Sequence, residues 1–205
     1  MELQTTVVAA LWLVIGYLFG SLPTGYVVVK TKTGQDIRTI GSGNIGATNV
    51  GRVLGKKWAV GVTIVDMFKG GAVVLLCRAC GGSDLDIALS ALGAVLGHNY
   101  PVWLRFHGGK GVATTFGTLF FVQVWYSCAA VLLAGILWFF IMKATRYVSL
   151  ASLVALLAIG GYFYFFGMHP AFFVLAFVLA AISFWRHRGN VNRLMHGTEN
   201  KVGRK

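Results

Sequence analysis

The densest group of residues that could do chemistry lies at 41–52, which reads GSGNIGATNVGR. Its four glycines can adopt positive φ, and successive backbone N–H groups in such a turn converge into a concave anion site. The side chains that add donors or charge are Ser42, Asn44, Thr48, Asn49 and Arg52. These residue types predict a phosphate-binding loop, and the alternative is a glycine-rich turn that only connects two helices.

A second candidate site is 107–111, HGGKG, directly before an apolar run that begins at Val112. A helix N-terminus offers unpaired N–H groups and the positive end of a dipole, so Lys110 beside it would attract an anion. The segment is not a Walker A loop, because Gly111 follows Lys110 where a Ser or Thr should hold magnesium. The alternative is a surface turn whose lysine stem covers apolar surface.

A third candidate is the polar stretch at 186–193, RHRGNVNR, after the last apolar run. His187 and Asn190 are three residues apart, so on a continuous helix they share a face, where the amide could orient the imidazole for proton transfer. A basic stretch that binds anionic lipid headgroups would explain the arginines but not this pair. Ser149, in RYVSLAS at 146–152, could donate to a phosphate, although a serine at a helix start is ordinarily a cap.

Asp66 and Lys69 are ionisable residues inside an apolar run, three apart and therefore on one helical face. Charges at membrane depth are costly unless paired, which predicts an ion pair that lines the site. His98 could act as a base, and the alternative is a capping or packing histidine. The carboxylates are scattered and the sequence has no Cys/His ligand set, so we expect no metal and no cofactor. The G-x-G-x-x-G match at 41–46 follows no strand, so it is not a dinucleotide fingerprint.

Composition assigns the chain to a membrane. Of its 205 residues, 57% are hydrophobic and 12% charged, and the mean hydropathy is +0.72, which leaves too few polar residues to cover a soluble globule. In a soluble protein the net charge of +12 would favour a nucleic-acid partner, but here the cations gather in loops between apolar runs, so no nucleic-acid partner is expected. The three cysteines do not form a disulfide or zinc framework and are expected to fill apolar space.

Seven apolar runs could cross a bilayer as complete, tilted or discontinuous helices. They lie at about 6–29, 58–78, 84–97, 112–127, 129–143, 148–166 and 170–186. Lys and Arg gather in the loops at 30–57, 98–111 and 143–147 and in the tail from 186, which includes Arg204 and Lys205. By the positive-inside rule these segments are cytoplasmic, so the N-terminus lies outside and the C-terminus inside.

The same charge distribution argues against one long helix at 112–143, because joining these two runs would place basic loops on opposite sides of the membrane. We therefore expect one all-α integral membrane domain over 1–205, with seven transmembrane helices. Every glycine-rich or basic loop then falls on the cytoplasmic face, where the separate candidate segments could contribute to one site.

Together these segments resemble the bacterial membrane-embedded glycerol-3-phosphate acyltransferases that use acyl phosphate as donor. The resemblance is carried by GSGNIGATNVGR at 41–52, GHNYPVWLRFHGGKGVAT at 97–114, RYVSLAS at 146–152 and RHRGNVNRLMHGTEN at 186–200, in this order over nearly the whole chain. It implies a seven-helix protein of the bacterial inner membrane, surrounded by membrane lipids, with its site at the cytoplasmic face. It also implies acyl phosphate and glycerol 3-phosphate as substrates, lysophosphatidic acid and phosphate as products, and the first step of phospholipid synthesis.

The resemblance further implies the roles of individual residues. The substrate-binding residues would be Gly43, Asn44, Gly46, Ala47, Thr48, Asn49, Arg52, Lys110 and Ser149, and the reacting centre would include Ser42, His187 and Asn190. An acyl phosphate carries a good leaving group, so attack by the 1-hydroxyl of glycerol 3-phosphate mainly needs alignment, charge neutralisation and one proton acceptor. We expect direct transfer, with either His187 or a phosphate oxygen of the donor as that acceptor.

Two other functions are alternatives. An organic-anion or phosphate-ester transporter could use glycine loops as anion sites, but it needs polar groups through the midplane, and the sequence shows no inverted repeat. A metal-dependent lipid-headgroup enzyme needs clustered acidic ligands or paired histidines, whereas the six acids of this chain are scattered. No obligate protein partner is expected.

Overall fold

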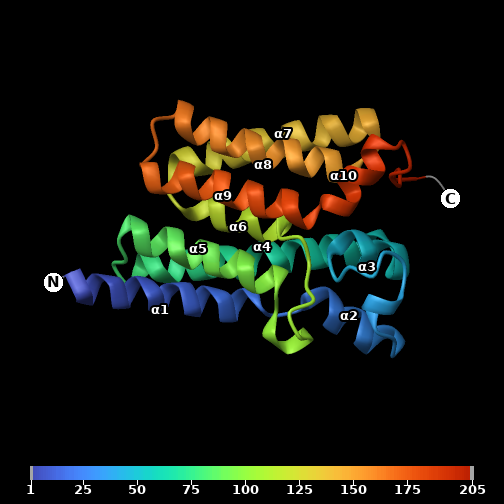
Figure 1. Ribbon diagram of the computed structural model, residues 1–205, viewed down its shortest axis with the longest axis horizontal. Helices are drawn as coiled ribbons and strands as arrows, with labels where there is room; N and C mark the ends of the chain where they lie inside the picture. The colour runs from blue at the N-terminus through green and yellow to red at the C-terminus, as the bar shows by residue number, and fades with distance from the viewer. Residues whose placement is uncertain (1, 204–205) are drawn as a thin grey trace. The chain divides into compact units, whose positions relative to one another are not determined.

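The computed structural model describes residues 2–203, with side chains from residue 5 onward. In chain order its helices are α1 (Glu2–Gly20), α2 (Thr24–Thr33), η1 (Ile37–Thr39), α3 (Ala47–Leu54), α4 (Lys56–Ala79), α5 (Asp84–Asn99), η2 (Val102–Leu104), α6 (Val112–Phe121), α7 (Val124–Thr145), α8 (Val148–Phe165), α9 (Pro170–Arg186) and α10 (Arg188–Met195) (Figure 1). No strand occurs in this range, so the all-α class is confirmed. Arg204 and Lys205, which we assigned to the cytoplasmic tail, lie outside the described residues.

The chain divides into two compact units, Met1–Thr118 (unit 1) and Leu119–Lys205 (unit 2). Unit 1 holds α1 to α5 and most of α6, and unit 2 holds the end of α6 and α7 to α10. Both predicted phosphate loops, at 41–52 and 107–111, fall in unit 1, whereas Ser149, His187 and Asn190 fall in unit 2. The expected single domain over 1–205 stays a prediction.

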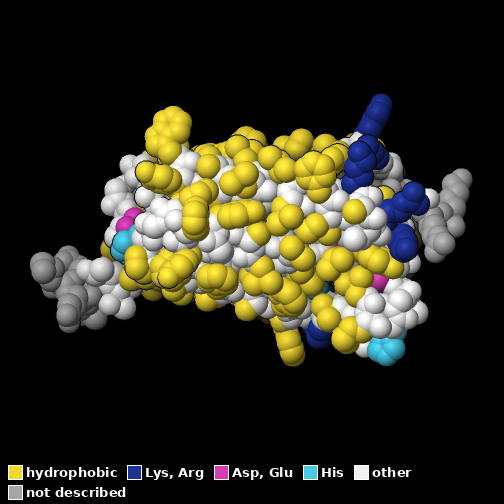
Figure 2. All heavy atoms as spheres, turned by 90° about the horizontal axis from the view of Figure 1, so that it is seen from above, with side chains coloured by type: hydrophobic (Ala, Val, Ile, Leu, Met, Phe, Trp, Pro, Cys, Tyr) yellow, Lys and Arg dark blue, Asp and Glu magenta, His cyan; other side chains and the backbone are white. Residues whose placement is uncertain are grey.

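Four helical segments are long and apolar enough to cross a membrane: Thr5–Thr33, Lys56–Ala79, Val124–Thr145 and Val148–Phe165. A fifth is added if α9 and α10, which meet at a bend of 66°, count as one span, and α6 is a shorter apolar helix. Figure 2 shows hydrophobic side chains over most of the face that it presents, with Lys and Arg gathered toward one end. Five of the seven predicted runs each match one helix, whereas 6–29 covers α1 and part of α2, and 112–127 covers α6 and the start of α7. The described residues support four or five candidate spans.

The boundary between the fourth and fifth predicted runs is wrong. These runs were expected to meet between 127 and 129, whereas α6 ends at Phe121 and α7 begins at Val124. Ser127 accounts for the break, because its Oγ donates to Phe120 O at 2.8 Å and accepts from Gln123 N at 3.1 Å. One hydroxyl therefore serves a backbone group at the end of α6 and another at the start of α7, which apolar patterning does not reveal.

In unit 1, α1 and α5 approach along two pairs of glycines, Gly16 and Gly20 on α1 and Gly93 and Gly97 on α5. A Cβ atom at Gly16 would overlap the carbonyl oxygen of Ser90, so the helix backbones are in contact at this point. Each pair is a G-x-x-x-G arrangement, which allows membrane helices to pack closely. Figure 1 shows α1 beside α5.

The glycine loop at 41–46 is mounted on α2 and on a small apolar core. A Cβ atom at Gly25 of α2 would overlap Ile45 O, so the loop backbone rests directly on that helix. The buried residues of the core beneath it are Val29, Ile37, Ile45, Val50, Val62 and Leu104. This core joins α2, η1, α3, α4 and η2, so it supports the glycine loop and also the short helix that precedes the loop at 107–111.

In unit 2, polar contacts connect helices that are otherwise apolar. Trp138 Nε1 of α7 donates to Ser152 Oγ of α8 at 3.1 Å. A Cβ atom at Gly160 of α8 would lie 2.9 Å from the ring of Phe177 of α9, so these two helices also pack closely. After α10 the chain returns to the turn between α7 and α8, where Val202 N donates to the carbonyl oxygen of Arg146 at 2.9 Å.

Candidate active site

The glycine loop has a defined backbone geometry. Gly41 and Gly43 adopt φ values of 61° and 69°, in the left-handed region that favours glycine. Gly43 N donates to Ile40 O at 3.0 Å, and Gly46 N donates to Asn44 Oδ1 at 2.9 Å. The side chain of Asn44 thus forms a turn with the backbone two residues later, while Ser42 and Gly43 are exposed.

Asn49 is the internal hydrogen-bond centre of this loop. It is 1% exposed, its Oδ1 accepts from Ser42 N at 2.9 Å, and its Nδ2 donates to Ile40 O at 2.9 Å. A Cβ atom at Gly41 would overlap Asn49 Oδ1, so glycine is required there by space as well as by φ. The polar atoms of Asn49 are therefore used to shape the loop.

The N-terminus of α3 follows the loop directly. Gly46 is its N-cap in an extended conformation, and no side chain caps the helix. The first amides of an α-helix have no partner within the helix and lie at the positive end of its dipole, so those of Ala47 and Thr48 suit an anion. Thr48 is exposed, and Arg52 is exposed in the last turn of the same helix.

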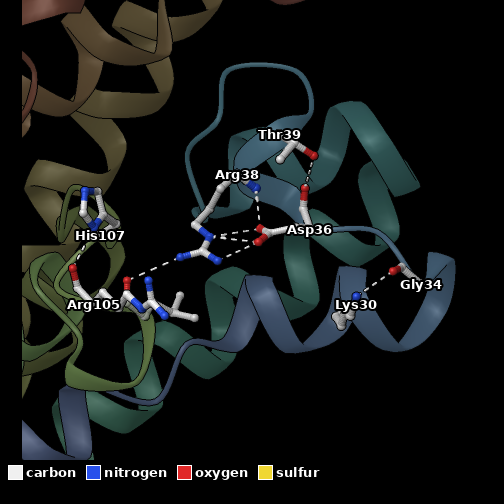
Figure 3. Close-up of polar contacts among 8 residues, drawn as sticks. Lys30, Gly34, Asp36, Arg38, Thr39, Arg105 and His107 are labelled. Carbon is white, nitrogen blue, oxygen red and sulfur yellow. Dashed lines mark hydrogen bonds and ion pairs between the residues drawn. The ribbon is translucent and has the colours of Figure 1, made fainter.

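An ion pair connects the approach to the glycine loop with η2 (Figure 3). Arg38 Nε and Nη2 donate to both carboxylate oxygens of Asp36, at 2.6–3.1 Å, and Arg38 Nη1 reaches Leu104 O at 3.4 Å. The guanidinium also lies over the ring of Tyr26, 5.5 Å from its centre. The hydrogen bonds from Arg38 hold the pKa of Asp36 below its ordinary value, against a smaller opposing effect of burial.

The second predicted phosphate loop runs from η2 to the start of α6. Gly109 N donates to His98 O at 3.0 Å, and Gly111 turns the chain with a φ of 78° before α6 begins at Val112. Lys110 is half-buried at this turn. His107 is exposed, with Nδ1 2.6 Å from Arg105 O. The structure thus places Lys110 next to a helix N-terminus, as the sequence predicted.

His187 lies at the bend between α9 and α10, so the expected continuous helix through His187 and Asn190 is wrong. His187 is 3% exposed, and its Nδ1 lies 2.8 Å from Ser183 O. A carbonyl oxygen only accepts, so Nδ1 carries a proton in this contact, and in the neutral imidazole Nε2 holds the lone pair.

Glu199 is the residue at the candidate site that sequence reasoning missed. Its Oε1 accepts from Ser149 Oγ at 2.9 Å and from Asn190 Nδ2 at 2.6 Å, and its Oε2 accepts from Arg193 Nε at 2.7 Å. Burial raises the pKa of this carboxyl, but the hydrogen bonds from Asn190, Ser149 and Arg193 outweigh that effect, and the net pKa is lowered. The available signal was that Glu199 is the one acid between residues 87 and 205.

The carboxylate of Glu199 therefore holds two residues that we predicted to contact substrate, Ser149 at the start of α8 and Asn190 in α10. Among residues 2–203, no three His, Cys, Asp or Glu side chains gather in a way that could hold a metal ion. The polar groups that the structure offers are suited to binding anions and moving a proton.

Comparison with known proteins identifies the family. The family model described as glycerol-3-phosphate acyltransferase matches residues 10–197. Proteins of that name from Rhodopseudomonas palustris and Thermus thermophilus are 45% and 47% identical, over 94% and 95% of this chain and 95% and 96% of theirs.

Two solved structures are also similar, both of PlsY (YgiH), an integral membrane glycerol 3-phosphate acyltransferase. Its glycerol 3-phosphate form matches with a TM-score of 0.88 and 40% identity, over 95% of this chain and 96% of that one. Its lysophosphatidic acid form matches with a TM-score of 0.86 and 38% identity, over 95% of each chain. This chain therefore belongs to the glycerol-3-phosphate acyltransferase family.

Proposed function

We propose that this protein transfers an acyl group from acyl phosphate to the 1-hydroxyl of glycerol 3-phosphate, which gives lysophosphatidic acid and inorganic phosphate. The observation that carries the proposal is the similarity, over 95% of this chain, to an acyltransferase solved in a glycerol 3-phosphate form and a lysophosphatidic acid form. Those two forms supply the acceptor and the product. Acyl phosphate as the donor rests on the family resemblance of the four sequence segments.

In this proposal the unit 1 loops bind phosphate groups. The amides of the first turn of α3 would donate to one phosphate, with the hydroxyls of Ser42 and Thr48 as additional donors beside the glycine loop. Arg52 and Lys110 would supply the positive charge that two anionic substrates need in order to approach each other. Asn44 and Asn49 would act by fixing the loop backbone, as their hydrogen bonds to Gly46 N and Ser42 N support.

The reaction forms one bond and breaks one. The hydroxyl oxygen of glycerol 3-phosphate attacks the acyl carbon, the bond between that carbon and the phosphate oxygen breaks, and phosphate leaves with the bonding electron pair. The hydroxyl proton passes to a base, either His187 or a phosphate oxygen of the donor. We propose direct transfer without an acyl-enzyme, because an acyl phosphate is already activated for attack and needs alignment and charge neutralisation.

His187 would accept the proton at Nε2. Its Nδ1 is engaged with Ser183 O, which fixes the tautomer and the ring orientation that this role requires. Ser149 and Asn190 would hold a phosphate or the acceptor hydroxyl, and the carboxylate of Glu199 would keep both side chains in place. No step in the proposed mechanism uses a metal or another cofactor.

The topology that we propose has seven membrane crossings in one domain over 1–205. The short helices α5 and α6 would each add a crossing to the candidate spans, and α9 would be the seventh, with α10 outside the bilayer. The basic segments would then lie in the cytoplasm and the protein in the bacterial inner membrane. The acyl chain would lie among membrane lipids between helices and reach the site from the side.

The test uses the purified protein in detergent without added divalent metal. Long-chain acyl phosphate or acyl-CoA is supplied with glycerol 3-phosphate, and lysophosphatidic acid and phosphate are measured. We expect product only with acyl phosphate and only when both substrates are present. Acyl transfer from acyl-CoA would contradict acyl phosphate as the proposed donor. Flux of glycerol 3-phosphate across the membrane of proteoliposomes, without acyl transfer, would indicate a transporter instead of an enzyme.

A further inference from the structure

Three ionisable side chains meet in the interior of unit 1. Asp66 and Lys69 of α4 and His98 of α5 are 3%, 7% and 5% exposed. Lys69 Nζ lies 2.8 Å from Asp66 Oδ1 and 3.1 Å from His98 Nδ1, and it donates to the carbonyl oxygen of Leu22 at 2.8 Å. The ion pair expected from the sequence is therefore present, and His98 is buried against it.

His98 Nδ1 faces the ion pair, 3.1 Å from Lys69 Nζ and 3.7 Å from Asp66 Oδ1. An ammonium group has only donors, so a neutral His98 accepts from Lys69 at Nδ1 and carries its own proton at Nε2. Nε2 faces the second phosphate loop, because a Cβ atom at Gly109 would overlap it. Gly109 N also donates to His98 O at 3.0 Å, so both the ring and the backbone of His98 support the residue that precedes Lys110.

The hydrogen bond from Lys69 to Leu22 O connects the cluster indirectly to the first predicted phosphate loop. Leu22 lies in the interruption between α1 and α2, and its carbonyl oxygen accepts from Nζ. α2 begins two residues later, and its Gly25 contacts the backbone of Ile45 inside the glycine loop. One buried ammonium therefore connects the chain segments that lead into both loops.

Stability alone does not account for such a cluster. Replacing a buried ion pair with neutral side chains of similar volume is often neutral or stabilising, whereas such pairs can specify one arrangement of the elements around them. Ionisable side chains in an apolar helix are costly to bury, and they commonly belong to a functional site. Here Lys69 contacts the segment that leads to the glycine loop, and His98 contacts the turn that presents Lys110, all within one unit.

We propose that Asp66, Lys69 and His98 form a positioning triad that holds the Gly109–Lys110 turn and the interruption between α1 and α2 in one geometry. The catalytic consequence rests on the proposed function, because the triad would present Lys110 and the glycine loop to the phosphate groups. The structural claim does not depend on that function and can be measured without substrate.

The test compares hydrogen–deuterium exchange at 105–112 in the purified full-length protein and in two altered forms. The double variant Asp66→Asn with Lys69→Met removes both charges, and His98→Asn keeps the charged pair but removes the ring under Gly109. We expect exchange at 105–112 to become about tenfold faster in both, as loss of a hydrogen bond to a charged group would cause. His107→Ala is the matched control, because that ring is exposed on the same loop and contacts Arg105 O.

Kinetics then separate positioning from folding. We expect both altered forms to raise KM for one or both of the phosphate-bearing substrates about tenfold while kcat stays near the wild-type value. Native exchange at 105–112 in folded His98→Asn would overturn the proposal, and so would equal loss of protection throughout unit 1. If the double variant does not fold, exchange in His98→Asn alone tests the proposal. If the wild type shows no acyl transfer, the proposed function is wrong, and the exchange experiment still tests whether the triad positions the loop.

Discussion

Glu199→Gln is the substitution with the most specific predicted effect outside the membrane helices. The carboxylate accepts three hydrogen bonds, from Ser149, Asn190 and Arg193. A glutamine can keep Oε1 for Ser149 and Asn190, but it places an NH₂ group where Oε2 accepts from Arg193, so two donors would face each other. The tail after α10 should therefore detach from α8 more often than in the wild type.

The expected magnitude follows from the contacts that change. A hydrogen bond to a charged group contributes about 1.5–3 kcal/mol, and the remaining two bonds are weakened when the acceptor becomes neutral. The Arg193 side chain is 42% exposed, which places its own contribution at the lower end. We expect the local opening of the tail to become easier by about 2–3 kcal/mol, which is roughly a 30- to 150-fold larger open population.

Hydrogen–deuterium exchange of residues 188–203 measures this opening under native conditions. Arg188→Gln is the matched control: it also removes one charge from the C-terminal segment, but Arg188 lies over the Trp185 ring and donates to Trp185 O rather than to Glu199. Because the pKa of Glu199 is lowered in the folded protein, the stability of the tail should fall as the pH is lowered. The carboxylate stabilises the fold at pH values above its unfolded pKa of about 4.5, and this stabilisation is lost as pH falls through the lower folded value. Opening in Glu199→Gln equal to that in Arg188→Gln at pH 7 would refute the reasoning.

Three further substitutions test other parts of the structure. Gly41→Ala should raise KM for glycerol 3-phosphate, because the added Cβ atom would overlap Asn49 Oδ1. Gly34→Ala is the control: Gly34 also has a positive φ, but its surroundings are open, so KM measured by steady-state kinetics should stay unchanged. Gly97→Ala should destabilise unit 1 by about 1–3 kcal/mol through overlap with the α1 backbone, whereas Gly61→Ala, with nothing near its Cβ, should be neutral or slightly stabilising in thermal unfolding. Arg38→Gln should increase hydrogen–deuterium exchange at 41–46, because it removes the contacts of Arg38 with Asp36 and Leu104 O. Lys30→Gln is the control, since the Lys30 ammonium contacts Gly34 O in Figure 3. Equal exchange at 41–46 in the two variants would argue against a role for the Arg38 contacts.

The sequence predicted the helical class and the backbone character of the two candidate loops because both depend on local features. Apolar runs separated by basic loops require membrane helices, and Gly41 and Gly43 indicate positive φ whatever surrounds them. The position of Lys110 before a helix was likewise readable from one change in composition. These features need no knowledge of distant contacts.

Features that depend on long-range contacts could not be predicted. The bend at His187 lies inside a pattern that continues a helix, and the start of α7 depends on hydrogen bonds of Ser127. Asn49 looked like a ligand residue because its partners, Ile40 O and Ser42 N, are backbone atoms that composition does not show. Glu199 acts on Ser149 across fifty residues of chain, so only the folded structure brings them together.

The most direct test of acyl transfer uses glycerol 3-phosphate labelled with oxygen-18 at the 1-hydroxyl, with acyl phosphate as donor and the purified protein as catalyst. We predict that lysophosphatidic acid and phosphate form in equal amounts, with the label in the ester oxygen of the lipid and none in the released phosphate. Release of fatty acid with the label bound to phosphorus would show attack at the phosphate, and it would contradict the proposed reaction.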